Sequence, residues 1–302
     1  MRLLTYRPSP GERERIGLVD PTGDRVIDVS ARLGEHDLGR LLADERLGDV
    51  ADLVGSDGDH VATDIVHERL LPWPRKIFCI GVNYGGRSAE YADTTDAAYP
   101  SVFLRYPDSF TGHDQPLVRP PESPQLDYEG EIVVVIGTAG RRIPIADARR
   151  HIAGLTLGNE GTIRDWVRHA KFNVTQGKNW TSTGAIGPQL VTIDEIGPFD
   201  DMEISTFVNG ERRQHDSPAS MKYSIEYQVH YLSTFTELHP GDIIFTGTPT
   251  GAGARLDPPQ WLAPGDVVEV TATGLGTLRN PVVDEFTADE LAARPRPAPE
   301  PR

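Results

Sequence analysis

Short apolar runs separated by glycine, proline and charged residues recur along most of the chain. They are rich in Val, Ile and Phe, and several alternate apolar with polar positions, which is typical of β-strands. The clearest runs, in chain order, are SVFLRY, EGEIVVVIG, AGLTLGN, QLVTI, MEISTFVNG, DIIFTGT and DVVEVTATG. The pattern predicts a mostly β domain with many turns.

Helical spacing is less frequent and is clearest in SMKYSIEYQVHYLSTF, where Met221, Ile225, Val229 and Leu232 form one apolar stripe. IADARRHI and TIRDWVRHA are shorter candidates. Two turns, LHPGDIIF and LAPGDVVEV, share a Pro-Gly-Asp order that suits a type II turn before a strand. Strands and helices do not alternate regularly, so a doubly wound parallel sheet is not expected. We expect a mixed β fold with a few covering helices instead.

The chain divides into three predicted segments. Residues 1–72 combine short strand-like pieces with the helical spacing of DLGRLLADERL and predict a small α+β module. The prolines of LPWPRK then mark a linker, and residues 75–285 form the larger domain. The proline-rich, charged residues 286–302 have little to bury and are expected to be a disordered tail.

Composition narrows the classes of partner. The 30 Lys and Arg against 45 Asp and Glu give a net charge of −15, which argues against nucleic acid and anionic membranes as partners. No apolar run approaches the roughly 20 residues of a membrane span. The single Cys79 excludes an internal disulfide framework and a cysteine-rich metal site. A cytoplasmic protein is expected.

Candidate chemistry begins at DYEGEIVVVI, where Asp127, Glu129 and Glu131 alternate before an apolar run. On one strand these three side chains would share a face, and their mutual repulsion and desolvation would be costly without a positive partner. A hard divalent cation, Mg²⁺ or Mn²⁺, suits such oxygen ligands. Glu160, between a predicted strand and helix, is the candidate third ligand.

The glycine-rich stretch GTPTGAG raises the alternative of a phosphate-binding loop. It lacks the full spacing of either nucleotide fingerprint and the lysine of the Walker type, so a nucleotide-dependent enzyme is the weaker hypothesis.

Taken together, several motifs resemble those of the fumarylacetoacetate hydrolase superfamily over most of residues 75 to 285. The motifs are, in order, IGVNYGGRSAEY, PSVFLRYPDSF, LDYEGEIVVVIG, GNEGTIRDW, QGKNWTSTGAIGPQLV, GDIIFTGTPTGAG and GLGTLRNPV. The resemblance implies a mixed β-roll, a homodimer, one divalent metal per site, and an N-terminal module of the kind found on many bacterial members.

The resemblance also implies a role for each matching residue. The metal ligands are Glu129, Glu131 and Glu160, although the family usually has aspartate at the last position. The catalytic lysine is Lys178. The substrate-binding residues are Tyr84, Arg105 and Thr248, with Arg105 suited to a bidentate carboxylate contact.

Family hydrolases activate water with a histidine and a glutamate on a lid loop. Here the glutamate is Glu90, but the histidine position holds Arg87, which cannot accept a proton at neutral pH. Val167 replaces a glutamine that assists water in some relatives. His113 in FTGHDQP is the candidate replacement base, and Arg87 itself could close over an anionic substrate.

The leading hypothesis is a metal-dependent enzyme that cleaves a C–C bond in a small, acylpyruvate-like 2-oxo acid through a stabilised enolate. Decarboxylation or keto–enol isomerisation of a 2-oxo diacid needs no activated water and is the alternative. A catalytically silent protein that binds metal and ligand is the third possibility.

Overall fold

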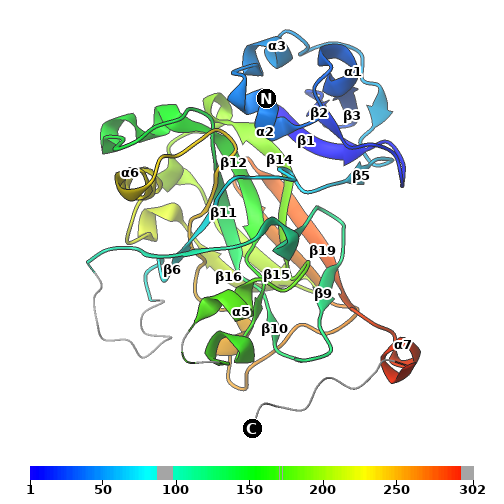
Figure 1. Ribbon diagram of the computed structural model, residues 1–302, viewed down its shortest axis with the longest axis vertical. Coiled ribbons are helices and arrows are strands. Elements are labelled where there is room, and N and C mark those ends of the chain that lie inside the picture. Colours follow the sequence, from blue (N-terminus) through cyan, green and yellow to red (C-terminus); the bar gives the residue numbers. More distant parts are fainter. Residues whose placement is uncertain (87–97, 170, 172, 294–302) are drawn as a thin grey trace.

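The computed structural model describes residues 1–86, 98–169, 171 and 173–293. One large mixed sheet runs through its centre (Figure 1). Its strand order is β4 (His60–Val61), β3 (Arg25–Asp28), β2 (Arg15–Val19), β1 (Arg2–Arg7), β14 (Gly184–Thr192), β12 (Ile152–Asn159), β11 (Gly130–Ile136), β17 (Ile243–Phe245), β6 (Ile77–Gly81) and β7 (Ser101–Leu104). At its margins β5 (Val66–His67) pairs with β1, and β8 (Phe110–Thr111) pairs with β14. The predicted mostly β, mixed architecture is confirmed.

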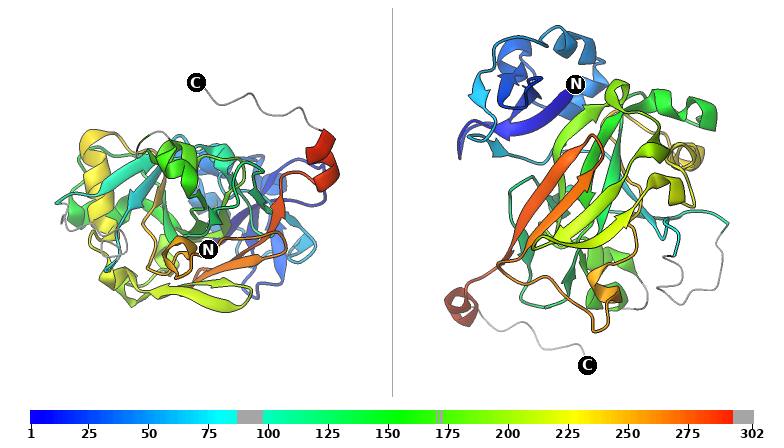
Figure 2. Two further views of the ribbon diagram at one scale, coloured as in Figure 1. Left: turned by 90° about the horizontal axis from the view of Figure 1, so that it is seen from below. Right: turned by 180° about the vertical axis from the view of Figure 1, so that it is seen from behind.

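A second sheet packs across the middle of the first, against β11 and β12 (Figure 2). Its order is β16 (Glu211–Asp216), β15 (Ile204–Val208), β18 (Val267–Ala272), β19 (Gly276–Asp284) and β9 (Leu117–Arg119). A separate short pair joins β10 (Leu126–Asp127) to β13 (Thr162–Ile163).

Strand β11 is buried along its whole length because both of its faces are covered. Ile132 and Val134 point into the core shared with the second sheet. Val133 and Val135 point the other way, into a core that includes residues of the N-terminal segment. Because both faces of β11 are buried, its sequence after Glu131 is continuously apolar and does not alternate between apolar and polar residues.

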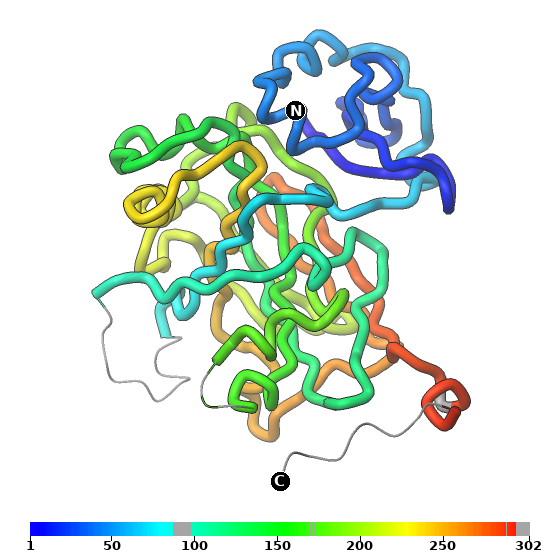
Figure 3. Tube along the Cα trace, in the orientation of Figure 1, coloured from blue at the N-terminus to red at the C-terminus, as the bar shows by residue number. Residues whose placement is uncertain are grey.

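The N-terminal segment continues the large sheet. Strand β1 pairs antiparallel with β14, so Leu3 lies opposite Leu190. Figure 3 shows this blue part of the trace directly against the rest of the molecule. Its helices are α1 (Val29–Leu33), α2 (Leu38–Ala43) and α3 (Leu47–Ala51). The segment predicted as a module therefore shares both hydrogen bonds and a core with the larger domain.

Helix α6 (Ile225–Phe235) confirms the strongest helical prediction, and Ile225, Val229 and Leu232 are buried on one face. Met221 lies before the helix and forms an isolated bridge with Tyr84. The described residues also form α5 (Val174–Lys178) and α7 (Ala288–Ala293). Helix α7 lies within residues 286–302, whose expected disorder remains a prediction.

The two shorter helical predictions form 3₁₀ turns instead of α-helices. IADARRHI becomes a 3₁₀ helix at Ile145–His151. TIRDWVRHA begins as strand β13 and continues as a 3₁₀ turn at Asp165–Arg168. Within the described ranges, none of the helices has the length and apolar character required to cross a membrane.

Both Pro-Gly-Asp turns have the predicted geometry. Gly241 and Gly265 have φ of 82° and 94°, in the left-handed region that glycine adopts without strain. Each turn is closed by a 3.0 Å hydrogen bond from the aspartate N–H to the carbonyl three residues earlier. The sequence pattern thus identified the start of β17 and of β18.

Candidate active site

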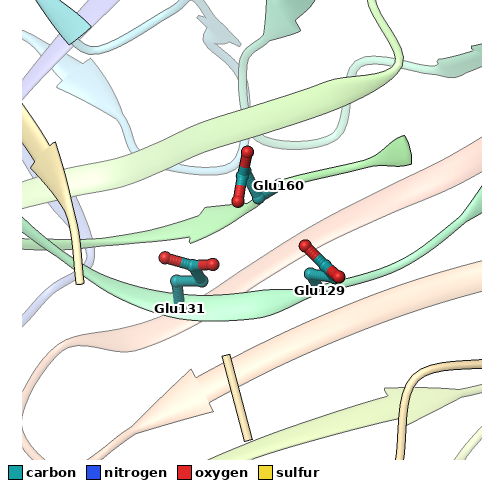
Figure 4. A group of neighbouring side chains, drawn as sticks. All are labelled: Glu129, Glu131 and Glu160. Carbon is teal, nitrogen blue, oxygen red and sulfur yellow. The ribbon is translucent and has the colours of Figure 1, made fainter. Parts of the chain in front are cut away.

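Three buried glutamates gather where β11 begins and β12 ends. The antiparallel register pairs Gly130 with Asn159, and the N–H of Glu160 donates to the carbonyl of Glu129 at 2.7 Å. Glu129, Glu131 and Glu160 each offer a carboxylate oxygen, and these oxygens lie within 4.8 Å of one another. Figure 4 shows the first two side chains rising from one segment towards the third. The residues predicted as metal ligands are thus brought together.

Asp127 does not belong to this group, so the expectation that three alternating carboxylates share one strand face is wrong. It lies in β10, which pairs with β13 and does not run on into β11. Its carboxylate accepts hydrogen bonds from the backbone N–H groups of Gly253 and Ala254, at 2.8 and 3.0 Å, and from Nε of Arg164 at 2.7 Å. Asp127 therefore anchors the glycine-rich loop.

Two cations bracket Glu129. Lys178 is the last residue of α5, a helix whose N-terminus is capped by Asn173. Its Nζ lies 2.5 Å from Oε2 of Glu129 and 3.2 Å from Oε1 of Glu160. Nη2 of Arg164 contacts the other oxygen of Glu129 at 2.6 Å. These contacts supply part of the positive charge that is needed to offset the buried glutamates.

Glu131 remains the poorly compensated member of the group. Burial raises its pKa well above the ordinary value, and the neighbouring Glu160 and Glu129 raise it further. The N–H of Gly247, which donates to its Oε2 at 2.7 Å, and the ammonium of Lys178 lower it only in part. Burial alone would lower the pKa of Lys178, but Glu129 and Glu160 outweigh burial and raise it, so its ammonium stays charged.

The donor set fits a divalent cation. All three side chains offer oxygen, which Mg²⁺ and Mn²⁺ prefer, and all three residues are buried. Oε1 of Glu160 is buried and forms ion pairs with Lys178 and Arg105 but no hydrogen bond among the described residues, so it retains acceptor capacity for an ion. A cation at this position would also remove the repulsion that raises the pKa of Glu131.

Arg105 is placed differently from the prediction. Its guanidinium is fully buried and donates to the Ser109 side chain and carbonyl, to the carbonyl of Gly161 at 3.0 Å and to the Thr183 hydroxyl. Its Nη1 lies 3.9 Å from Oε1 of Glu160. Because protein groups occupy the fork, a bidentate contact with a substrate carboxylate is not available in this structure. Arg105 instead holds the carbonyl of Gly161, the residue after Glu160, and places positive charge near the Glu160 carboxylate.

Tyr84 and Thr248 flank Glu131 in different ways. The Tyr84 hydroxyl is buried and has no hydrogen-bond partner within the described ranges, and burial together with Glu131 raises its pKa. The Thr248 hydroxyl donates to the carbonyl of Gly130 at 2.9 Å. Tyr84 can therefore donate to a ligand, whereas the proton of Thr248 is already used by the backbone. Substrate contact by either residue remains a prediction.

Comparison with known proteins agrees with this arrangement. The family model described as fumarylacetoacetate (FAA) hydrolase C-terminal matches residues 76–283. The chain belongs to the fumarylacetoacetate hydrolase family. Oxaloacetate tautomerase YisK of Bacillus subtilis is 41% identical to it over 217 residues, which cover 70% of this chain and 71% of that protein. Mitochondrial oxaloacetate tautomerase fahd2 of Xenopus laevis is 33% identical over 295 residues, 94% of this chain and 90% of that protein.

The fold gives the same assignment. The structure of fumarylacetoacetate hydrolase from Exiguobacterium antarcticum superimposes with a TM-score of 0.80 at 31% identity, covering 94% of this chain and all of that one. The family resemblance drawn from the sequence motifs is thereby confirmed, and the chain is an enzyme of this family.

His113, the predicted replacement base in this family member, does not lie in the site. Its Nδ1 accepts the N–H of Arg279 at 3.1 Å, and its Nε2 is 3.2 Å from Asp114. Its ring packs edge-on against His67, with centroids 4.8 Å apart. Burial lowers its pKa. The loop that carries His113 turns towards β19, so both ring nitrogens contact residues outside the group of Glu129, Glu131 and Glu160.

Arg87 and Glu90 both lie outside the described residues, and their predicted roles are untested. Val167 is in the 3₁₀ turn Asp165–Arg168. The sequence reasoning missed Arg164, although it lies in the quoted GNEGTIRDW motif four positions after Glu160. A basic residue so close to a predicted ligand was the available signal.

Proposed function

We propose that this enzyme uses Mg²⁺ or Mn²⁺ to interconvert the keto and enol forms of a small 2-oxo diacid of the oxaloacetate class. The observation that carries the proposal is the composition of the buried site: three carboxylates and one ammonium lie together, and none of the nine histidines in the described part of the chain joins them. The names of both sequence relatives, oxaloacetate tautomerases, support this choice over C–C bond hydrolysis.

The chemistry follows from the side chains. Glu129, Glu131 and Glu160 would hold the divalent ion, which would supply Lewis-acid chemistry to a 2-oxo acid. Lys178, kept charged by its contacts with two of these carboxylates, places a positive charge where it would stabilise an oxygen that gains negative charge. The hydroxyl of Tyr84 is a further donor beside Glu131.

Tautomerisation moves one proton from the carbon beside the 2-oxo group and adds one proton to the oxygen. No water is consumed, so no water-activating base is needed. Hydrolysis needs such a base, and this sequence has Arg87 and Val167 where family hydrolases have histidine and glutamine. Decarboxylation requires the same stabilisation of an enolate and must be distinguished by its product.

The test follows three reactions of the purified enzyme supplied with Mn²⁺ or Mg²⁺. Enol oxaloacetate is monitored by its ultraviolet absorbance, pyruvate by a coupled lactate dehydrogenase assay, and acylpyruvate cleavage by loss of the substrate chromophore. Metal-dependent enol decay without pyruvate supports the proposal. Rapid pyruvate formation identifies a decarboxylase, acylpyruvate cleavage identifies a hydrolase, and inactivity in all three with bound metal identifies a silent ligand-binding protein.

We also propose that the enzyme is a homodimer, as the family resemblance implies. Among the described residues, β7 is the last strand at its end of the large sheet. Leu104 in β7 and Tyr106 just after it are 53% and 60% accessible. Apolar groups beside an unpaired strand edge are suited to a partner. Sedimentation velocity on the wild-type chain tests this, and a monomer at micromolar concentration contradicts it.

A further inference from the structure

A buried glutamine connects the second sheet to the carboxylate site. Gln214 lies on β16, is 1% exposed, and uses all of its amide functions within the protein. Its Oε1 accepts the N–H of Gly130 at 3.0 Å. Its Nε2 donates to the Thr248 hydroxyl at 2.9 Å and to the Pro249 carbonyl at 2.8 Å.

These bonds close a small ring around Gly130, the first residue of β11. The Thr248 hydroxyl that accepts from Gln214 donates in turn to the carbonyl of Gly130. Both polar groups of Gly130 are therefore fixed, one directly by the glutamine and the other through Thr248. Gly130 separates Glu129 from Glu131, so the ring holds the backbone from which both carboxylates extend.

The same ring orients the loop that contacts Glu131. Gly247, the residue before Thr248, donates its N–H to Oε2 of Glu131 at 2.7 Å. A shift of Thr248 would move this donor relative to the carboxylate. Packing adds to the restriction, because a Cβ on Gly130 would come within 2.0 Å of the Thr206 hydroxyl on β15. The backbone at Gly130 is therefore packed closely against the second sheet.

We propose that Gln214 is a positioning residue of the metal centre, which fixes the separation of Glu129 and Glu131 and the donor of Gly247 together. The proposal rests on the divalent-metal site proposed above. Groups that orient ligands without touching the metal typically contribute about 10- to 100-fold to metal affinity. We therefore expect Gln214→Leu to weaken Mn²⁺ binding by about tenfold or more.

A simpler role would be to satisfy buried backbone groups, in which case Gln214 would affect stability alone. Two further variants separate the roles. Thr248→Val opens the ring while keeping side-chain shape, and Thr248→Ser keeps the hydroxyl. Thr206→Val is the matched control, since it alters the same contact between sheets at a hydroxyl without a hydrogen-bond partner in the described ranges.

The experiment is calorimetric titration of the chelator-treated full chain with Mn²⁺, with melting temperatures measured in parallel. Weakened binding in Gln214→Leu and Thr248→Val, recovered in Thr248→Ser and absent from Thr206→Val, supports the proposal. Wild-type affinity in Gln214→Leu with only a lower melting temperature overturns it. If that variant does not fold, the comparison of Val with Ser at position 248 decides, and equal affinities overturn the proposal. A wild-type chain that binds no Mn²⁺ overturns the metal site itself, so the two failures are distinguishable.

Discussion

Replacing Glu131 with glutamine should stabilise the metal-free protein. The side chain is buried, and its pKa is raised because burial and two neighbouring carboxylates oppose its charge. In the folded state it binds a proton more tightly than in the unfolded state, so stability is lost as the pH rises from its unfolded pKa through its folded one. Glutamine removes that loss and keeps an oxygen that can accept the N–H of Gly247.

The size of the expected stabilisation follows from the distance between the carboxylate oxygens. At the 4.8 Å that bounds the ligand oxygens, two unit charges repel by about 3.5 kcal/mol for an effective dielectric constant of about 20. Glu131 faces two such neighbours, and Lys178 offsets part of the repulsion. A net gain of about 2 to 4 kcal/mol is reasonable on this scale. For 302 residues, with about 2.1 cal/mol/K of unfolding entropy per residue, this gain raises the melting temperature by about 3 to 6 °C.

The assay is thermal unfolding of wild type and Glu131→Gln, each with chelator and with saturating Mn²⁺, from pH 5 to pH 8. The variant should melt higher than wild type in chelator at pH 8, and the difference should shrink towards pH 5. Mn²⁺ should raise the melting temperature of wild type only, because binding to the folded state stabilises it. A lower melting temperature for the metal-free variant at pH 8 would refute the electrostatic account of this site.

Three further predictions concern the neighbours of the triad. Lys178→Met should lower turnover about 100-fold or more while changing Mn²⁺ affinity less than about tenfold; equal losses in kinetics and calorimetry would exclude a role at the substrate. Arg105→Lys and Glu160→Asp should be coupled in a double-mutant cycle on Mn²⁺ affinity by at least about 0.5 kcal/mol, since the two side chains are 3.9 Å apart; additive effects would show that they act separately. Tyr84→Phe should raise KM and leave Mn²⁺ affinity unchanged, because its hydroxyl has no partner among the described residues; unchanged steady-state kinetics would remove it from the substrate site.

Local patterns predicted local structure well. The buried run of β11 and the amphipathic stripe of α6 are governed by the period of side chains along each element. The turns at Gly241 and Gly265 are governed by the freedom of glycine at positive φ. Each of these signals depends on a few consecutive residues, which a sequence displays directly.

Properties set by distant pairing were not predictable in the same way. A period of two residues placed Asp127 on the same strand face as Glu131. In the structure Asp127 lies in β10, which pairs with β13 in a separate sheet, whereas Glu131 lies in β11 of the large sheet. The surroundings of Arg105 depend on the Gly161 carbonyl and the Thr183 hydroxyl, which lie far along the chain. Its residue type therefore suggested a ligand contact where the fold supplies protein partners. The pairing of β1 with β14 likewise has no local signature, and it joins the predicted module to the larger sheet.

The charges around the triad bear on the proposed metal and the proposed anionic substrate. In the described part of the chain, the buried group contains one more carboxylate than cation; its members are Asp127, Glu129, Glu131 and Glu160 with Arg105, Arg164 and Lys178. A divalent ion reverses this imbalance and leaves one uncompensated positive charge. Such a site is poorly suited to a neutral ligand, because a buried excess charge is costly unless it is paired. A carboxylate substrate provides the pairing, so metal affinity and substrate affinity should increase together.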